Sequence, residues 1–274
     1  MKPIPDLPYP ADELSHLQKL SKLFEDWHAC FTTGASQLDK HIPDEIVCDG
    51  FYPHYFNQQL RILYIGRESR QISGLNYLEV LFPAYRTGKK IGDRSLNADK
   101  FHSRMLRITH GLLNGTPDWS AIPSANEIGD TFGTEAGISF AFMNLSKLSN
   151  EADEWQSDWS AIEAAHLLSN ETRRFSEEEI AILKPHIVIT MKLGEKLKSL
   201  GSLQRIESQE SVTAWQLDSA GHRSLLIDTF HFSAWSKHDV RDFYGPIGEV
   251  VAIIRRNIGE CPCQIPSHPA DICP

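Results

Sequence analysis

Four short apolar, β-rich runs separated by helical patterns are the feature that most limits how this chain can fold. The runs cover residues 61–66, 137–144, 185–190 and 224–229, and each ends on, or leads into, glycine or polar residues. Helical patterns cover residues 11–30, 99–113, 158–168, 177–183, 195–200 and 236–257, the last interrupted near Gly245 and Pro246. Strands that alternate with helices predict a parallel sheet covered on both faces. We therefore expect an α/β fold: three α/β/α layers around a mostly parallel, four-stranded sheet.

The length of 274 residues fits one large α/β domain, which can bury a sizeable core. We expect residues 1–60 to form a helical and irregular extension packed on the core. Residues 61–258 are expected to form the α/β domain, and residues 259–274 a tail containing Pro and Cys. Ser176 and Glu179 have the spacing of a capping box, which predicts a helix start there.

Charge is distributed unevenly along the chain. The formal net charge of -9 argues against a protein that coats nucleic acid non-specifically, because such binding depends on Lys and Arg. Residues 61–107 nevertheless carry ten basic and four acidic side chains, a net charge of +6 against -15 for the remainder. A narrow crevice facing phosphates therefore stays compatible with the composition.

Apolar runs and cysteine usage bear on location. No apolar run approaches the ~20 residues that a membrane helix needs, and the first residues lack the apolar stretch of a signal peptide. Five cysteines, an odd number, are typical of a reduced protein. We expect a cytoplasmic monomer that does not bind a membrane.

Polar residues follow each of the four predicted strands. These segments are Gly66-Arg-Glu-Ser-Arg70, Asn144-Leu-Ser-Lys147, Met191-Lys-Leu-Gly194 and His231-Phe-Ser233. In open parallel sheets ligands bind at the carboxyl ends of the strands. A carboxylate, an amide, a histidine and a serine are therefore expected around one crevice.

In these segments the chain resembles the uracil-DNA glycosylase superfamily. Gly66-Arg67-Glu68 is similar to the family's Gly-Gln-Asp-Pro-Tyr motif, and Gly74-Leu-Asn-Tyr77 to its Gly-Leu-x-Phe segment. Phe142-Met-Asn144 resembles the Leu-Leu-Leu-Asn strand end, and His231-Phe-Ser233 resembles His-Pro-Ser. These motifs follow one another in the family's order and together span about residues 61–255. Ser69 and Phe232 replace prolines of the family motifs, and Arg70 replaces a tyrosine that excludes thymine, which leaves the substrate open.

The resemblance implies hydrolysis of the N-glycosidic bond of a base flipped out of DNA, a base that is modified or deaminated. In that reaction Asn144 reads the edge of the base and Tyr77 stacks on its ring. His231 donates to the base oxygen that gains charge, and Glu68 orients water or offsets the positive charge on the sugar.

The implied partner is DNA, damaged or single-stranded, and the resemblance implies no cofactor. Ser233 is expected to hold a flanking phosphate, and Arg67 and Arg70 lie in the basic stretch where the phosphate backbone has to pass. This set of residues includes no metal ligand.

Each of these residues also has a purely structural interpretation. Glu68 can be an ion-paired loop carboxylate, Asn144 a turn residue, Tyr77 a core aromatic, His231 a structural histidine and Ser233 a helix cap. The alternative for the whole chain is a non-catalytic module on the same fold that binds a nucleotide, a nucleic acid or a protein.

Other motifs give weaker indications. The tail residues Cys261, Cys263, His268 and Cys273 are possible zinc ligands, but a packed or irregular tail is the simpler interpretation. The chain contains no G-x-G-x-x-G, no complete P-loop, no H-E-x-x-H and no G-x-S-x-G motif. Dehydrogenase, P-loop NTPase and α/β-hydrolase functions therefore lack their usual motifs.

Overall fold

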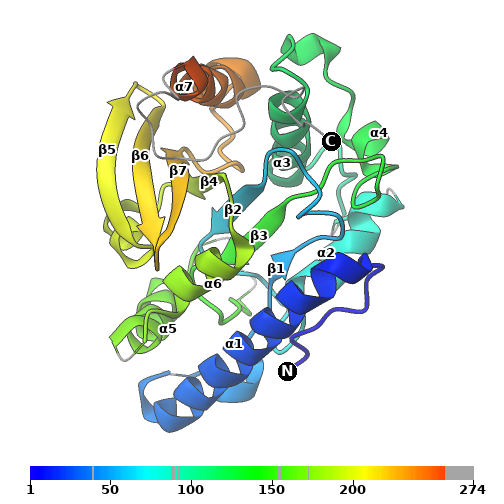
Figure 1. The fold of residues 1–274 in the computed structure, drawn as a ribbon. Coiled ribbons are helices and arrows are strands. Elements are labelled where there is room, and N and C mark those ends of the chain that lie inside the picture. The colour runs from blue at the N-terminus through cyan, green and yellow to red at the C-terminus, as the bar shows by residue number, and fades with distance from the viewer. Residues whose placement is uncertain (39, 88–89, 92, 153–155, 172, 257–274) are drawn as a thin grey trace.

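A computed structural model describes residues 1–38, 40–87, 90–91, 93–152, 156–171 and 173–256 (Figure 1). The strands of these residues form one seven-stranded sheet in the order β1-β3-β2-β4-β7-β6-β5. The strands are β1 (Gly50–Phe51), β2 (Ile62–Gly66), β3 (Ala141–Asn144), β4 (Ile187–Met191), β5 (Ser202–Ser208), β6 (Val212–Ser219) and β7 (His222–Thr229).

The middle of the sheet is parallel and its two edges are antiparallel. Strands β3, β2, β4 and β7 run in the same direction, and these are the four strands that the sequence predicts. β1 pairs with β3 in the opposite direction, and β6 and β5 continue the sheet antiparallel beyond β7. The prediction of an α/β fold is confirmed, but the sheet has seven strands and is mixed. Two of the three extra strands escape sequence analysis because β1 is two residues long and β5 is mostly exposed.

Six of the helices exceed eight residues within the described ranges. They are α1 (Leu14–Thr33), α2 (Tyr77–Arg86), α3 (Lys100–Leu113), α5 (Trp159–Glu171), α6 (Phe175–Leu183) and α7 (Gly245–Arg256). The short α4 (Ala125–Gly129) follows α3. A π-helical segment at Asp239–Tyr244 leads directly into α7, so the helix predicted over residues 236–257 begins three residues later and changes type at Gly245 without a break.

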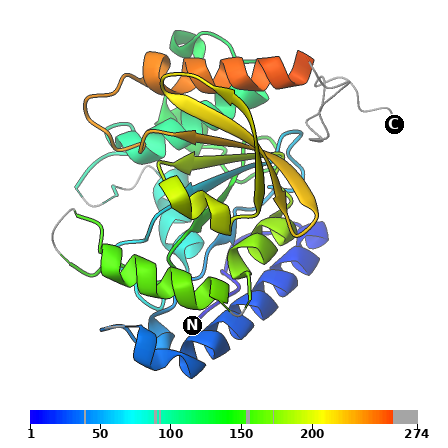
Figure 2. The same cartoon turned by 90° about the vertical axis from the view of Figure 1, so that its left-hand side faces the viewer.

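Successive residues of the parallel strands contribute to two different hydrophobic clusters, as alternation along a strand requires. Tyr64 and Ile189 belong to a cluster with side chains of α2, α3 and α7. Leu63 and Val188 belong to a second cluster with side chains of α1 and α6. Figures 1 and 2 agree in showing α7 on one side of the sheet and α1, α5 and α6 on the other. The parallel strands are therefore buried along both faces.

Two details of the predicted helices are wrong. α6 begins at Phe175 with Arg174 as its N-cap, so Ser176 and Glu179 lie inside the helix and form no capping box. The predicted helix at residues 195–200 is a 3₁₀ helix, Gly194–Ser199. Elsewhere, α3 and α5 begin and end within three residues of the predicted bounds.

The remaining predictions concern membrane-spanning helices and the C-terminal tail. Within the described residues, no helix has the length and apolar character needed to cross a bilayer. The possible zinc ligands Cys261, Cys263, His268 and Cys273 lie outside the described residues, as does the whole predicted tail at 259–274.

Candidate functional site

The carboxyl ends of the parallel strands bring the four polar segments to one edge of the sheet. β2 and β3 are in register up to their last residues, so Gly66 lies opposite Asn144. β7 pairs with β4, which in turn pairs with β2. The four segments, which begin at Gly66, Asn144, Met191 and His231, therefore leave the sheet at the same edge, where α/β proteins bind ligands.

Asn144 lies at this edge with a buried amide group that is only partly used. Its side chain is 2% exposed, and its backbone N–H donates to Asp49 Oδ2 at 2.7 Å. Gly66 is required beside it, because a Cβ there would lie 2.9 Å from Asn144 Oδ1 and 3.0 Å from the ring of Phe142. The side-chain Nδ2 is buried and has no hydrogen-bond partner within the described residues. Such a donor is costly to bury unless it meets an acceptor, so Nδ2 is a candidate ligand contact.

Tyr77 begins α2, where the Asn76 side chain caps the helix by accepting from the N–H groups of Leu78 and Glu79. Its ring stacks on the ring of Phe142 with centroids 4.5 Å apart and an angle of 11° between the planes. Because of this stacking, Phe142 occupies one face of the Tyr77 ring, and Tyr77 as a whole is buried. The structure places Tyr77 next to the strand that ends in Asn144, as a packed aromatic ring.

His231 is held in one neutral tautomer. The backbone N–H of Ser233 donates to His231 Nδ1 at 3.3 Å, and the Ser233 hydroxyl lies 2.7 Å from the same atom. A backbone N–H can only donate, so Nδ1 carries the lone pair and the ring proton resides on Nε2. Burial, and to a smaller extent the charge of Arg67, lowers the pKa of His231 to about 4. At neutral pH His231 is therefore an uncharged donor through Nε2.

A row of aromatic rings connects Asn144's strand to His231. Phe101 of α3 lies with its ring centroid 5.5 Å from that of His231 and 6.2 Å from that of Phe142. Phe142 in turn stacks on Tyr77. The buried amide and the neutral imidazole are thus attached to one aromatic cluster.

The segment after β7 is anchored by a buried arginine, Arg104 of α3, which is 1% exposed. Its guanidinium donates to the carbonyl of Phe232, to the carbonyl of Lys237 at 3.0 Å and to Asp239 Oδ1 at 2.8 Å. The fork geometry of a guanidinium suits several acceptors at once. Arg104 therefore fixes the loop that carries His231 and Ser233.

Glu68 points toward a different neighbour. Its carboxylate accepts from Asn150 Nδ2 at 3.2 Å. Burial raises the pKa of Glu68, and hydrogen bonds from Asn150 and Ser157 partly oppose that rise. Arg70 donates to the Ala152 carbonyl at 2.7 Å. The structure therefore places Glu68 and Arg70 against the segment after β3.

The charge of Arg67 acts on both Glu68 and His231. Its guanidinium lies 5.0 Å from the centre of the Trp159 ring, and its Nε is buried without a hydrogen-bond partner within the described part of the chain. Burial lowers the pKa of Arg67, whereas Glu68 and Asp228 act in the opposite direction. Among the basic residues predicted to contact phosphate, Arg67 is the one with an unused buried donor.

Sequence analysis misses the buried charges beneath Asn144. Lys147 Nζ lies 2.6 Å from Asp49 Oδ1 and 2.8 Å from Glu179 Oε2, and all three side chains are fully buried. Burial alone would lower the pKa of Lys147, but the two carboxylates raise it. Burial and the nearby Asp49 raise the pKa of Glu179. A charged residue three positions after a strand end is the only sequence signal for this triad.

Trp235 is the second feature that sequence analysis misses. It is 74% exposed, the most exposed of the large hydrophobic side chains in the described residues. Arg94 and Lys100 carry their charges 5.5 Å and 5.6 Å from the centre of its ring. An exposed ring accompanied by cations, four residues after His231, is suited to stack on a base beside a phosphate.

The described residues contain no group of three or more His, Cys, Asp or Glu side chains placed to hold a metal ion. Comparison with known proteins adds no assignment: no family model, no curated protein and no solved structure matches this chain. Function has to be inferred from the site itself.

Proposed function

We propose that this protein hydrolyses the N-glycosidic bond of a modified or deaminated base that is flipped out of DNA. The proposal includes the three-layer architecture of the uracil-DNA glycosylase superfamily, which the chain resembles in its strand-end segments. The observation that carries it is the pairing of two donors at one edge of the sheet. These are the buried, unpartnered Nδ2 of Asn144 and the neutral Nε2–H of His231.

Two donors select the kind of base. A base that carries oxo groups offers acceptors to both, whereas an exocyclic amino group offers only another donor. Deaminated bases such as uracil, hypoxanthine and xanthine have gained an oxo group. In this proposal Asn144 Nδ2 binds one base acceptor. His231 Nε2–H donates to the base oxygen that becomes negative as the glycosidic bond breaks.

The remaining roles follow the same geometry. Water forms the new bond to the anomeric carbon, the base leaves with the electron pair of the glycosidic bond, and Glu68 orients that water or offsets the charge on the sugar. Tyr77, stacked on Phe142, supplies the aromatic wall of the base site. Ser233 and Arg70, both already hydrogen bonded, and Arg67, with its free Nε, are the proposed phosphate contacts.

Exposed side chains near the site favour a nucleic-acid substrate. Trp235 offers a stacking surface for an unpaired base, and Arg94 and Lys100 bring positive charge to the same position. Stacking of an aromatic side chain on a base contributes about 1–3 kcal/mol. Such contacts suit a single strand or the surroundings of an extruded nucleotide.

The test is a glycosylase assay on single- and double-stranded oligonucleotides that contain uracil, hypoxanthine or xanthine. We expect base release from at least one of them, and a loss of about 10²–10³-fold in Asn144→Ala and His231→Gln, as for a removed transition-state donor. Asn126→Ala and His238→Gln, at exposed positions, are the matched controls. If the folded protein releases no base from any substrate, the proposal is wrong.

The position of Glu68 favours a second candidate, a non-catalytic module that binds the same kind of base. Its carboxylate is already hydrogen bonded to Asn150, which leaves it less free to act on water. Titration of the same oligonucleotides separates the two candidates. Saturable binding that is lost in Asn144→Ala, without base release, supports the binding module; base release that is lost in Glu68→Gln supports the enzyme.

A further inference from the structure

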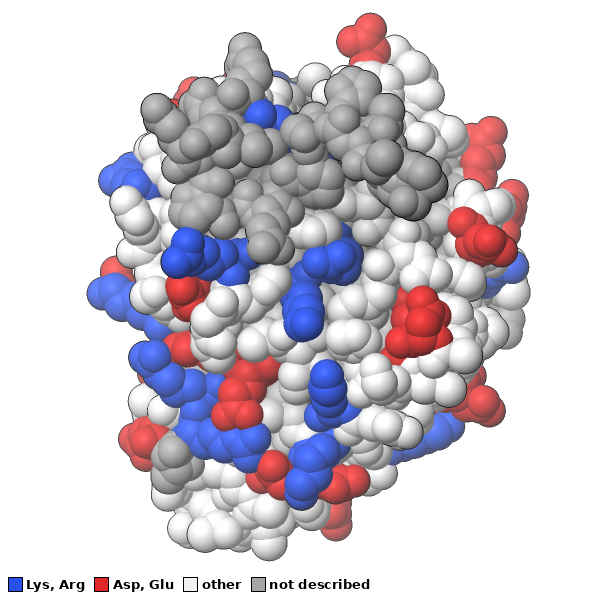
Figure 3. All heavy atoms as spheres, in the orientation of Figure 1, with Lys and Arg blue, Asp and Glu red and all other residues white. Residues whose placement is uncertain are grey.

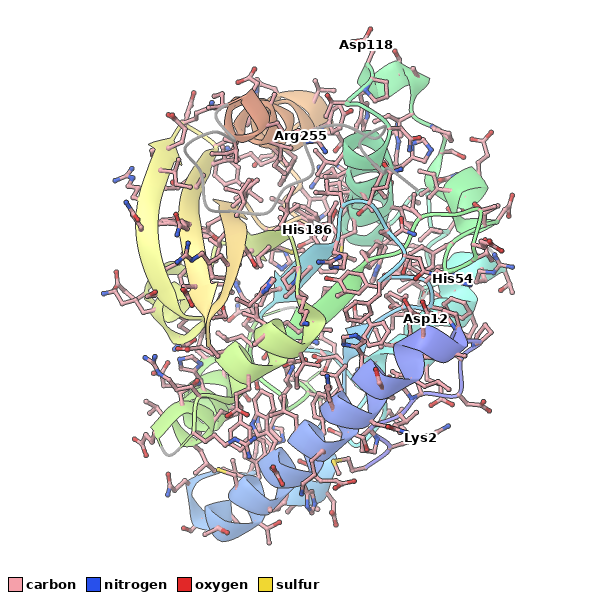
Figure 4. All side chains as sticks on the ribbon, viewed as in Figure 1. Lys2, Asp12, His54, Asp118, His186 and Arg255 are labelled. Atoms are coloured by element: carbon pink, nitrogen blue, oxygen red, sulfur yellow. The ribbon has the colours of Figure 1, made fainter. Side chains whose placement is uncertain are left out.

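A groove at the opposite edge of the sheet carries an uncompensated cluster of positive charge. The groove has a volume of about 270 Å³ and lies between α1, the end of α6 and the turn between β6 and β7. Lys184 at its rim precedes β4, and Ala220 precedes β7. It therefore lies at the amino ends of these strands, whereas Asn144 and His231 lie at the carboxyl edge. His186, at the start of β4, marks the region near the centre of Figure 4.

The cations of this groove lack acidic partners. Lys19 and Lys184 line it, and neither forms an ion pair within the described residues. Arg61 adds a third charge nearby, and its Nε donates to the neutral carbonyl of Lys184 at 2.7 Å. Glu178, the one carboxylate among the described residues that line the groove, accepts hydrogen bonds from Nε and Nη2 of Arg173, each at 2.6 Å. Figure 3 shows Lys and Arg side chains, with Asp and Glu side chains among them, on the face of the molecule seen in Figure 1.

His16 also lines the groove. Its ring stacks on Phe56 with centroids 3.7 Å apart, and it hydrogen bonds to the backbone of Ile182. Its Nδ1 is buried and has no hydrogen-bond partner within the described ranges. Burial lowers the pKa of His16, as do the charges of Lys19, Lys184 and Arg61. A bound anion would relieve that repulsion.

The floor of the groove is apolar, with Ala181, Ile182 and Ala220. Ligand pockets commonly have volumes of about 300–1,000 Å³, so this groove suits one small molecule rather than a duplex. A phosphate monoester provides oxyanions for the two lysines. Its organic part can cover the apolar floor.

We propose that this groove binds the terminal phosphate of a small phosphate monoester, such as a nucleoside monophosphate, between Lys19 and Lys184. The phosphate can belong to a free nucleotide or to the 5′ end of an oligonucleotide, and the chemistry is the same in both. This site is separate from the candidate glycosylase site and does not depend on activity there.

Calorimetric titration at constant ionic strength tests the site with inorganic phosphate, a nucleoside monophosphate and the corresponding nucleoside. We expect saturable binding of both phosphates, about tenfold tighter for the monophosphate, and none for the nucleoside. Two oligonucleotides, with and without a 5′-phosphate, distinguish a strand end from a free nucleotide as the source.

Lys19→Gln and Lys184→Gln should each weaken monophosphate binding about tenfold, because each removes a charge-assisted contact. Lys198→Gln is the control, since Lys198 is exposed and paired with Glu195. Both lysines of the groove are exposed, so the variants are expected to fold, and circular dichroism verifies this. Absence of phosphate binding to the wild-type protein would overturn the proposal. Unchanged binding in a variant that combines Lys19→Gln with Lys184→Gln would overturn it as well.

Discussion

The two halves of the candidate site each rest on a buried cation, but the two cations hold different partners. Beneath Asn144, Lys147 contacts the carboxylates of Asp49 and Glu179, all without exposure. Beneath His231, Arg104 contacts the carbonyls of Phe232 and Lys237 and a half-exposed Asp239. The first half is an ionic cluster inside the core, and the second is a loop tied by one side chain.

This difference predicts how each half responds to substitution. Removing a buried charge leaves its partners uncompensated in a medium of low dielectric constant, which destabilises the entire fold. Removing an arginine from carbonyl groups leaves neutral acceptors, and a surface loop can turn these toward water. We therefore expect substitutions beneath Asn144 to destabilise the entire fold, and substitutions beneath His231 to loosen only the loop after β7.

Lys147→Met has the largest expected effect. The variant leaves two buried carboxyl groups without their cation, so we expect the free energy of unfolding to fall by about 3–5 kcal/mol. Urea unfolding followed by circular dichroism measures it. Adding Asp49→Asn and Glu179→Gln to Lys147→Met should restore much of the loss. A single variant as stable as the wild type would show that the ion pairs are not structural.

Arg104→Lys comes next. Lysine keeps the charge but loses the fork that reaches several acceptors, and we expect a loss of about 1–2 kcal/mol. Hydrogen exchange should accelerate mainly at residues 232–239, with the sheet amides almost unchanged. Lys237→Ala, which keeps the carbonyl that Arg104 binds, is the control. Equal acceleration across the sheet would remove the distinction between the two halves.

Local sequence patterns reveal the parallel strands and the site residues at their ends, but not the edge strands. The parallel strands are evident from sequence because they are buried on both faces and therefore apolar throughout. Asn144 and His231 follow directly, since both come within two residues of a predicted strand end. β5 is different: five of its seven residues are exposed and few are apolar, so no local pattern marks it and its pairing with β6 determines it.

The supporting residues are not evident from sequence for a related reason. Asp49 lies in a stretch without helical or strand periodicity, and its partner Lys147 is 98 residues away. Glu179 has the spacing of a capping box, but the burial of α6 against α1 turns it toward Lys147 instead. Local patterns cannot specify such partners, because long-range packing decides which charges meet.

Glu179→Gln tests the ionic half with a smaller change. The pKa of Glu179 is raised in the folded state, so the folded protein retains a proton that the unfolded chain releases above its ordinary pKa of 4.5. Stability of the wild type is therefore expected to fall as the pH rises from this value. Glutamine does not titrate, so the decline in the free energy of unfolding between pH 5 and 8 should be smaller in the variant. Unfolding in urea at both pH values measures it; identical slopes would contradict the prediction.

Trp235→Ala should have the smallest effect on stability and a clear effect on binding. The ring is 74% exposed, so the free energy of unfolding should change by less than about 0.5 kcal/mol. Affinity for a single-stranded oligonucleotide should fall about tenfold, as expected for a lost stacking contact. Ile206→Ala, another exposed apolar side chain but on β5, is the matched control in fluorescence anisotropy titrations. If both variants bind equally well, nucleic acid does not reach the loop after His231. The His231 half would then position a donor without contributing a binding surface.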